Sequence, residues 1–514
     1  MRLLAGRPAA HLSPASARGR GRTALTRRPP MSLPTTPDDP VSREQPSPDD
    51  AAARRGAWAS IREALAGSQQ DYTRGPIGRS VFLLAVPMVL EMALESVFAV
   101  TDVFFVARLG ADAVATVGLT ESMLAVVYAL AMGLGIGVTA TVARRIGERD
   151  VDGAARAAVQ AIVLATAGAA VLGIAGAILA PRLLALMGAS PAVIAVGSGY
   201  ARVMLGGEVT IILLFVVNAV FRGAGDAAIA MRVLWLANAI NIVLGPCLIF
   251  GLGPFPTLGV TGAAIATTVG RGTGALFALV RLVRPGSRVP VGRRHLAVDL
   301  PAMGRLVRLS AAGVVQALVG TASWIGLVRI VATFGSEALA GYTIGIRVVV
   351  FALLPSWGLS NAAATMVGQA LGADDPTRAE RAVWKTGAYN ALFLGATGLA
   401  FVLFARPIVS LFSTDPAVVA YGTDCLRVLA YGFPLYAYGM VLTQAFNGAG
   451  DTLTPTWINV GVFWVWEIPL AYALALPLAL GVHGVFVAVT IAFSTLAVVS
   501  AGLFRRGRWR TRTV

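Results

Sequence analysis

The chain has 514 residues, of which 56% are hydrophobic and only 13% are charged, and its formal net charge is +16. Soluble globular chains carry about 25% charged residues, so this composition argues against a protein whose whole surface faces water. The excess of arginine does not indicate nucleic-acid binding either. The arginines gather in short segments between long apolar runs, which is how membrane proteins distribute positive charge in their cytoplasmic loops.

Residues 1–75 differ in composition from the rest of the chain. Met1 to Pro30 contains seven arginines, no acid and no apolar core, so it is not a secretory signal. We expect a disordered cytoplasmic segment or an upstream start codon with Met31 as the true start, although the arginine-rich composition also resembles an organellar transit peptide. Trp58 to Ala66 is expected to form a short interfacial helix.

Twelve apolar segments follow, and several reach the roughly 20 residues that a helix needs to cross a bilayer. The predicted fold class is therefore an all-α polytopic membrane protein with about twelve transmembrane helices. The segments are approximately 81–106, 115–142, 156–179, 189–220, 229–252, 259–283, 306–333, 340–366, 382–404, 415–445, 456–478 and 482–504.

The first segment carries three acids, Glu91, Glu95 and Asp102, although a carboxylate at a helix centre costs roughly 2.5–3.5 kcal/mol on insertion scales. Their spacings of four and seven residues place all three on one stripe of a helix. Lipid cannot accommodate such a stripe, so it should face a protein interior or a water-filled cavity. Either the acids bind and release ions, or they only hydrogen-bond to neighbouring helices; the shared stripe favours ion binding.

Other polar residues in the first half give weaker signals. Asn238 and Asn241 share a face of the fifth segment, where packing through hydrogen bonds is as good an explanation as ligand binding. Glu208 in the fourth segment is a candidate buried charge.

A hexapeptide that ends the fourth segment, Phe221 to Asp226, returns as Phe446 to Asp451, at an offset of 225 residues. The same shift aligns Gly110 with Gly335 and Asp150 with Asp375, so the chain contains two related halves. Glycine after a helix takes the left-handed conformation that ends it, and Asp can cap the next helix. We therefore expect hinge loops rather than ligand sites at Gly223, Gly225, Asp226, Gly448, Gly450 and Asp451.

The repeat sets the domain organisation. Residues 76–284 form an N-lobe of six helices, 285–304 a basic cytoplasmic linker, 305–504 a C-lobe of six helices, and 505–514 a basic cytoplasmic tail. Because each half has an even number of helices, the lobes should be related by a parallel pseudo-two-fold axis along the membrane normal.

The second half adds two groups of candidates. Arg347 and Glu467 are candidate buried charges in the eighth and eleventh segments. A cavity for aromatic cations would need π faces, and the candidates to line it are Trp357, Phe433, Tyr436 and Tyr438, although aromatic residues at a membrane interface are the commoner explanation. The stretches Val307 to Phe334 and Leu426 to Phe446 contain no acid.

The chain resembles the multidrug and toxic compound extrusion (MATE) family. The resemblance rests on Thr101-Asp102 and Arg108-Leu109-Gly110, on the paired Gly-Ala-Gly-Asp loops, on Asn241 to Leu244 with Pro246, and on Gly259 to Ala264, over about residues 76–505. It implies an antiporter that exports amphipathic organic compounds in exchange for H⁺ or Na⁺.

The resemblance also suggests where ions bind. Some family members use an Asp in the first helix, an Asn and an Asp four residues apart in the fifth, and a Thr in the sixth. Asp102, Asn241 and Thr267 match these positions, whereas Gly245 replaces the second Asp and Glu95 stands where Gln is common. Another branch uses acids in the seventh and tenth helices. Since the two stretches named above lack acids, the coupling site is expected in the N-lobe.

We therefore expect a secondary antiporter for amphipathic, cationic compounds that works by rocking-lobe alternating access, with a lipid-linked precursor flippase as the alternative. No enzyme activity, cofactor, nucleic-acid partner or metal site is expected beyond H⁺ or Na⁺ at the coupling site. The expected partners are small organic substrates and the lipid bilayer. The protein should be a monomer in the plasma membrane with both termini in the cytoplasm.

Overall fold

The computed structural model describes residues 57–67 and 70–512, and within these ranges it describes no side chain for residues 57, 99, 100, 102 and 103. The expectations for residues 1–56 lie outside the described part. Every regular element in the described part is a helix, and twelve spans are long and apolar enough to cross a membrane. The predicted fold class is confirmed, and the short helix before the first span is present as α2 (Ala57–Ala66).

The N-lobe contains the first six spans. They are α3 (Ile77–Ala107), α4 (Ala111–Gly147), α5 (Val151–Leu186), α6 (Pro191–Gly206) with α7 (Glu208–Gly223), α8 (Ala227–Phe250) and α9 (Val260–Val283). The fourth span is interrupted between α6 and α7, at Gly207.

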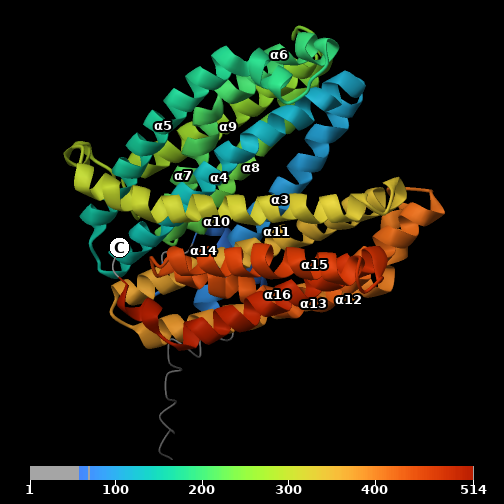
Figure 1. Cartoon of the computed structure of the whole chain (residues 1–514). Helices are drawn as coiled ribbons and strands as arrows, with labels where there is room; N and C mark the ends of the chain where they lie inside the picture. The colour runs from blue at the N-terminus through green and yellow to red at the C-terminus, as the bar shows by residue number, and fades with distance from the viewer. Residues whose placement is uncertain (1–56, 68–69, 513–514) are drawn as a thin grey trace, which may run out of the picture. The chain divides into compact units, whose positions relative to one another are not determined.

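The C-lobe contains the other six. They are α10 (Leu300–Ala332), α11 (Ser336–Gly372), α12 (Pro376–Ser410), α13 (Pro416–Gly448), the eleventh span made of α14 (Leu453–Asn459), η2 (Val460–Glu467) and α15 (Ile468–Ala475), and α16 (Gly481–Arg505). In Figure 1 the green helices of the N-lobe gather above the yellow-to-red helices of the C-lobe.

The sequence repeat is visible in the backbone of the loops. Gly225 and Gly450 have φ angles of 82° and 84°, so each takes the left-handed conformation that ends a helix. The amide of Asp226 donates to the Phe221 carbonyl at 2.8 Å, and that of Asp451 donates to the Phe446 carbonyl at 3.0 Å. The helix-stop prediction is confirmed in both halves, while the role of these loops as hinges stays a prediction. Asp226 stands at the N-cap of α8 without a side-chain cap hydrogen bond.

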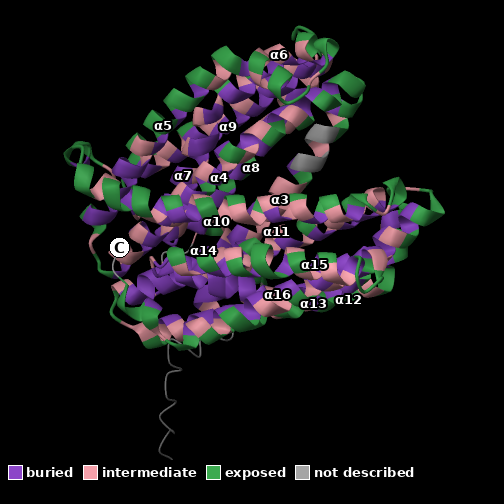
Figure 2. Cartoon of the chain, viewed as in Figure 1, coloured by how far each residue is buried: buried purple, intermediate pink, exposed green. Residues whose placement is uncertain are grey.

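Apolar side chains form a separate core in each lobe. One buried cluster consists almost entirely of N-lobe residues, and two others consist of C-lobe residues. Figure 2 shows these buried residues inside each group of helices and exposed ones on the outer faces. Exposed apolar side chains such as Ile174, Ile178 and Leu392 are what lipid-facing helices require.

The first helix of each lobe, α3 or α10, packs against the second helix of the other lobe. Where α10 crosses α4, a Cβ on Gly133 of α4 would lie 2.6 Å from the Val314 backbone nitrogen of α10. The equivalent crossing in the other half brings Gly358 of α11 against α3, where a Cβ would lie 2.6 Å from the Met88 carbonyl oxygen. Glycine is required at both crossings because the backbones touch.

A second symmetric contact closes one end of the bundle. A Cβ on Gly147 of α4 would lie 2.1 Å from the Gln369 carbonyl of α11, and one on Gly372 would lie 2.1 Å from the Arg144 carbonyl. The four residues are related by the same 225-residue shift. The loops after α4, α7, α9 and α11 meet at this end together with the C-terminal residues. We call it the arginine-rich end, because arginines such as Arg144, Arg222, Arg284 and Arg508 lie in or next to these segments.

The segment before α3 lies across this end and contacts both lobes. Arg232 of α8 donates to the Leu65 carbonyl at 2.6 Å, and Arg378 of α12 donates to the carbonyls of Tyr72, Arg74 and Gly75 at 3.0, 2.9 and 2.9 Å. We name residues 57–67 and 70–76 the strap. It connects the N-lobe to the C-lobe at the closed end.

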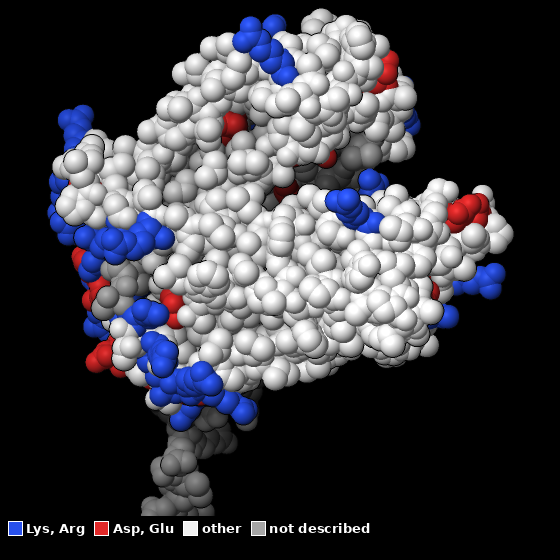
Figure 3. All heavy atoms as spheres, viewed as in Figure 1, with Lys and Arg blue, Asp and Glu red and all other residues white. Residues whose placement is uncertain are grey.

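At the opposite end the lobes separate. The cross-lobe contacts described above all lie in the helix halves nearest the arginine-rich end. Figure 3 shows the surface hollowed between the two groups of helices, with acidic side chains inside the hollow. A pocket of roughly 280 Å³ between α3 and α11 lies in this region, lined by Ser96, Val97, Thr101 and Phe351.

Candidate functional site

Two acids of α3 point into the N-lobe, as the predicted stripe requires. Glu91 is 2% exposed, and one of its carboxylate oxygens accepts a hydrogen bond from Arg222 of α7 at 3.1 Å. The other oxygen is buried without a hydrogen-bond partner among the described residues. Glu91 is therefore half of a buried ion pair, which supplies the charge compensation that a carboxylate needs inside a bilayer.

Glu95, one turn further along α3, is less buried. Its carboxylate accepts a hydrogen bond from the Asn238 amide of α8 at 3.2 Å and lies 4.0 Å from the guanidinium of Arg271 on α9. Arg271 also donates to the Tyr128 hydroxyl of α4 at 2.7 Å. Four helices thus meet around Glu95, next to the pocket that Ser96 and Val97 line.

Asn241 and Thr267 form the neighbouring pair. The Asn241 amide donates to the Thr267 hydroxyl at 2.7 Å, and both side chains are buried. Gly270 allows α9 to approach this closely, because a Cβ there would lie 2.5 Å from the Ala237 carbonyl. The structure therefore brings together five of the six predicted ion-coupling residues; the side chain of Asp102 lies outside the described residues.

Sequence reasoning missed two charged residues of this site. Arg271 is only 8% exposed and lies between the rings of Phe98 and Tyr128, 5.8 and 5.6 Å from their centroids. Glu121 on α4 is exposed and within electrostatic range of Arg271 and of Arg347 on α11. A search for every ionisable residue inside the apolar segments would have found both.

Arg347 is not buried. The sequence suggested a buried charge in the eighth span, but its side chain is exposed on α11. The reason is that this turn of α11 faces the N-lobe across the hollow between the lobes, and does not face the C-lobe core. Its electrostatic influence on Glu121 crosses from one lobe to the other.

The four aromatic residues predicted to line a cavity do not come together. Trp357 is exposed on α11, whereas Phe433 is fully buried and packs edge-on against Phe401 in the C-lobe core. Tyr436 stacks on Phe493, with ring centroids 3.9 Å apart, and Tyr438 lies beside Trp384. The prediction is wrong for Phe433, because residues spaced along one helix point to different faces.

The tenth span does contain an acid. The stretch without acids begins at Leu426, but α13 begins at Pro416 and includes Asp424, whose carboxylate lies 2.8 Å from Nδ1 of His483 on α16. Both side chains are half-exposed near the open end of the C-lobe. The stretch from Leu426 to Phe446 contains no acid, as stated above, but the helix as a whole includes Asp424, which is paired with His483.

The remaining two candidates are buried carboxylates in different lobes. Glu208 begins α7 at the break in the fourth span, is 2% exposed and has one oxygen without a hydrogen-bond partner among the described residues. Glu467 ends η2 in the eleventh span and is also 2% exposed. Both side chains are therefore buried, and a role for either carboxyl group stays a prediction.

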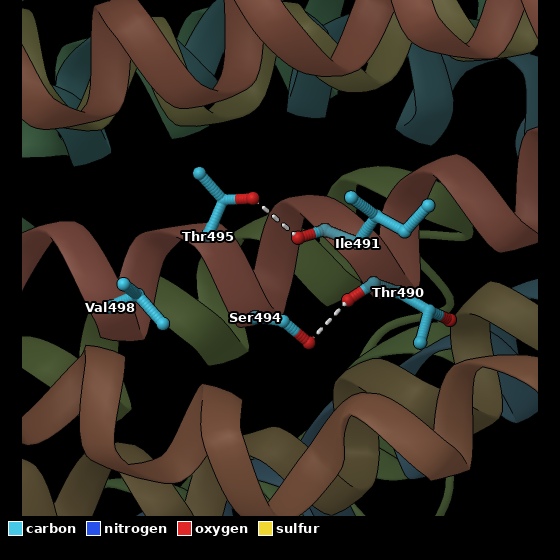
Figure 4. Close-up of a pocket in the computed structure, with 5 residues that line it drawn as sticks. All are labelled: Thr490, Ile491, Ser494, Thr495 and Val498. Carbon is cyan, nitrogen blue, oxygen red and sulfur yellow. Dashed lines mark hydrogen bonds between the residues drawn. The ribbon is translucent and has the colours of Figure 1, made fainter.

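One further pocket lies along α16 and does not resemble a binding site. Its lining residues, Thr490, Ile491, Ser494, Thr495 and Val498, all come from this single helix (Figure 4). The Ser494 and Thr495 hydroxyls donate to carbonyls four residues earlier, at 3.0 and 2.8 Å. These donors are therefore already used, and the surface that remains is mainly apolar.

Twelve spans in two related lobes, with an ion-pairing cluster in one lobe beside a hollow between them, define an integral multi-pass membrane transporter. The family model MatE matches residues 87–247 and 314–473, one match in each lobe. The chain belongs to this family, the multidrug and toxic compound extrusion transporters.

Known relatives cover nearly the whole transporter region. The chain is 26% identical over 443 residues to the probable multidrug resistance protein YoeA of Bacillus subtilis, covering 85% of this chain and 95% of the relative. It is 28% identical over 404 residues to a FAD transporter of Shewanella oneidensis, covering 77% and 88%. A solved structure described as the outward-facing conformation of a multidrug resistance MATE family transporter matches with a TM-score of 0.80 and 27% identity, covering 86% of this chain and 98% of that structure.

Proposed function

We propose that this transporter exports amphipathic organic cations in exchange for protons, and that the N-lobe cluster around Glu95 couples the two movements. The observation that carries the proposal is the position of Glu95. Its carboxylate contacts Asn238, lies 4.0 Å from Arg271 and is 29% exposed beside the pocket between α3 and α11. A carboxylate in such a place can exchange a proton with the hollow and change its interaction with Arg271 when it does.

Protons are favoured over sodium by the available ligands. Sodium needs several oxygen ligands, yet Gly245 stands where a second carboxylate would be, and the Thr267 hydroxyl already accepts a hydrogen bond from the Asn241 amide. Among the described residues no group of three His, Cys, Asp or Glu could hold a metal ion. Proton exchange requires only the carboxylates.

Alternating access would follow from the symmetric contacts between the lobes. The arginine-rich end belongs in the cytoplasm by the positive-inside rule, which places both described ends of the chain there and makes this conformation outward-facing. Protonation of the cluster would change the charge of the N-lobe wall and bias the lobes between two states. The expected location is the plasma membrane.

Cationic substrates are favoured because Glu95 and Glu121 both reach the hollow. The positive charge of Arg347 favours a second candidate, which is a negatively charged substrate with an aromatic ring system. FAD, which gives the Shewanella oneidensis relative its name, is such a compound. The comparisons give no support to the flippase alternative.

A transport assay separates these cases. Proteoliposomes loaded with a cationic dye are given a pH gradient without Na⁺, or a Na⁺ gradient at constant pH, with and without excess FAD. The proposal expects dye movement under the pH gradient alone and no inhibition by FAD. Movement that requires Na⁺ would reject proton coupling, and competition by FAD would favour the second candidate.

A further inference from the structure

The C-lobe contains a buried carboxylate that the N-lobe site does not explain. Glu467 is 2% exposed in the eleventh span, and no hydrogen bond or ion pair to it occurs among the described residues. Glu91, equally buried in the N-lobe, has Arg222 as a partner. Because an ionised carboxylate without a partner is very unfavourable in such an environment, a positive charge must compensate it.

Two tyrosines lie within electrostatic range of Glu467, Tyr342 of α11 and Tyr436 of α13. The hydroxyl of Tyr342 is buried and has no hydrogen-bond partner among the described residues. Both rings are held by α16, since Tyr342 stacks on Phe486 and Tyr436 stacks on Phe493. The C-lobe interior therefore holds a buried carboxylate and, within electrostatic range of it, a tyrosine hydroxyl that has no hydrogen-bond partner among the described residues.

The charged residues of the neighbouring helices do not neutralise this carboxylate. α10 and α16 pack against η2 and α15, and their ionisable residues make no ion pair with Glu467 in the described structure; these residues are Arg305, Arg308, Arg329, His483 and Arg505. His483 is paired with Asp424 instead. Cys425 of α13 is within electrostatic range of Tyr342.

The backbone at this position is also unusual. Residues 460–467 form a π-helix that ends at Glu467, whereas the equivalent residues of α8 are regular α-helix. π-helical turns are rare and occur frequently at functional sites. Among the described residues, the π-helix occurs in the C-lobe and not in the N-lobe. The N-lobe position equivalent to Glu467 is Ile242.

We propose that Glu467 is a proton-binding site of the C-lobe, separate from the N-lobe cluster, with the Tyr342 and Tyr436 hydroxyls within electrostatic range of it. A hydrated proton from the aqueous phase adds to the carboxylate and gives a neutral carboxylic acid and water, which removes the uncompensated charge from the C-lobe interior. One carboxylate and two hydroxyls suit a proton better than a sodium ion. This site goes beyond the proposed antiport function and does not depend on it.

Infrared difference spectroscopy tests the proposal without measuring transport. The full chain in liposomes is titrated with acid, and the carboxylic acid C=O band is followed in the wild type, in Glu467→Gln and in Glu337→Gln, a control at the exposed start of α11. We expect Glu467→Gln to lose one titrating band that the wild type and the control retain. Identical spectra in the wild type and Glu467→Gln would overturn the proposal, and so would loss of this band on adding Na⁺ at constant pH.

A second variant covers the case in which Glu467→Gln does not fold. Tyr342→Phe removes only the hydroxyl without a partner and keeps the ring that stacks on Phe486. We expect it to retain the band and to shift its position or its midpoint pH. A band unchanged in both respects would contradict the proposed site.

Discussion

Glu91 and Arg222 show how a carboxylate is tolerated inside the N-lobe. Their side chains are 2% and 14% exposed, and they are joined by a 3.1 Å contact. The Arg222 carbonyl also accepts a hydrogen bond from Thr365 of α11 at 3.0 Å, so the pair lies where the two lobes touch. Breaking one half of such a pair leaves a buried charge without compensation.

We expect Arg222→Ala to destabilise the protein by roughly 3–5 kcal/mol, because it leaves Glu91 unpaired. Thermal unfolding in detergent, monitored by intrinsic fluorescence, measures the change. The double variant Glu91→Gln/Arg222→Ala should recover much of the loss. The single variant Glu91→Gln is measured as well. If the stability losses of the two single variants simply add up to the loss of the double variant, the pair does not interact as described.

Asp226 predicts a pH dependence. Burial raises the pKa of this carboxyl group above its ordinary value of 3.8, against the lowering influence of Arg288 and Arg232. Because the folded-state pKa is the higher one, the contribution of this group to stability is complete below pH 3.8 and is lost as pH rises through the raised value. Asp226→Asn should therefore unfold at a higher temperature than the wild type at neutral pH, with the difference shrinking toward pH 4.

Asp451 provides the matched control, since it occupies the same position in the other half. Its carboxylate accepts a hydrogen bond from Thr454 at 2.7 Å and lies 3.5 Å from Arg512. Asp451→Asn removes the negative charge that attracts Arg512 and should give no gain in stability. Equal behaviour of the two variants across the pH range would contradict this explanation.

At the scale of helices, the crossing of α4 and α11 explains how one end of the bundle closes. Gly147 and Gly372 let the two backbones touch, and a methyl group on either would overlap a carbonyl oxygen at 2.1 Å. The contact is symmetric because the two halves share one ancestral pattern of glycines.

Gly147→Ala should open this crossing, because overpacking costs about 1–3 kcal/mol. That cost corresponds to a roughly 5–150-fold increase in the ratio of open to closed conformations. Distances between spin labels at the arginine-rich ends of α4 and α11 would report a larger open population than in the wild type. Gly304→Ala is the control, because no atom lies within 4 Å of a Cβ there. Unchanged distances in Gly147→Ala would rule out the crossing as the closing contact.

The strap adds a third connection between the lobes. Arg378 holds it through three carbonyl oxygens, and hydrogen bonds to charged groups contribute about 1.5–3 kcal/mol each. Arg378→Ala should therefore raise hydrogen exchange in residues 57–67 and 70–76 by at least 10-fold. Arg381→Ala, an exposed arginine on the same helix, should leave the exchange unchanged; equal effects would show that Arg378 does not hold the strap.

Helices were more predictable from the sequence than the site was. Long apolar runs and the 225-residue repeat determine the spans and the glycine turns, because both depend on local chemistry. The shared stripe of Glu91 and Glu95 was also predictable, since helical periodicity is fixed. The partners Arg222 and Arg271 were not, because they come from helices far apart in the sequence. Phe433 and Arg347 were misplaced for the same reason: the face that a helix turns to its neighbours depends on tertiary packing.

For the whole molecule, the lobes share one scaffold but differ in their charges. Glu91, Glu95 and Asp102 align with Gln316, Gly320 and Leu327 in the C-lobe. Among the described residues, the N-lobe therefore holds Glu95 beside the hollow, whereas the C-lobe holds Glu467 in its interior and Asp424 paired with His483 near its open end. This asymmetry is the basis for placing coupling in the N-lobe.

Dye efflux from proteoliposomes under an imposed pH gradient tests that placement most directly. Asp102→Asn and Glu95→Gln are compared with the wild type and with Glu337→Gln, an exposed acid outside the cluster, at equal reconstituted amounts. We expect the pH-driven rate to fall at least 10-fold in each N-lobe variant and to stay at the wild-type value in Glu337→Gln. Wild-type rates in both N-lobe variants would contradict this placement.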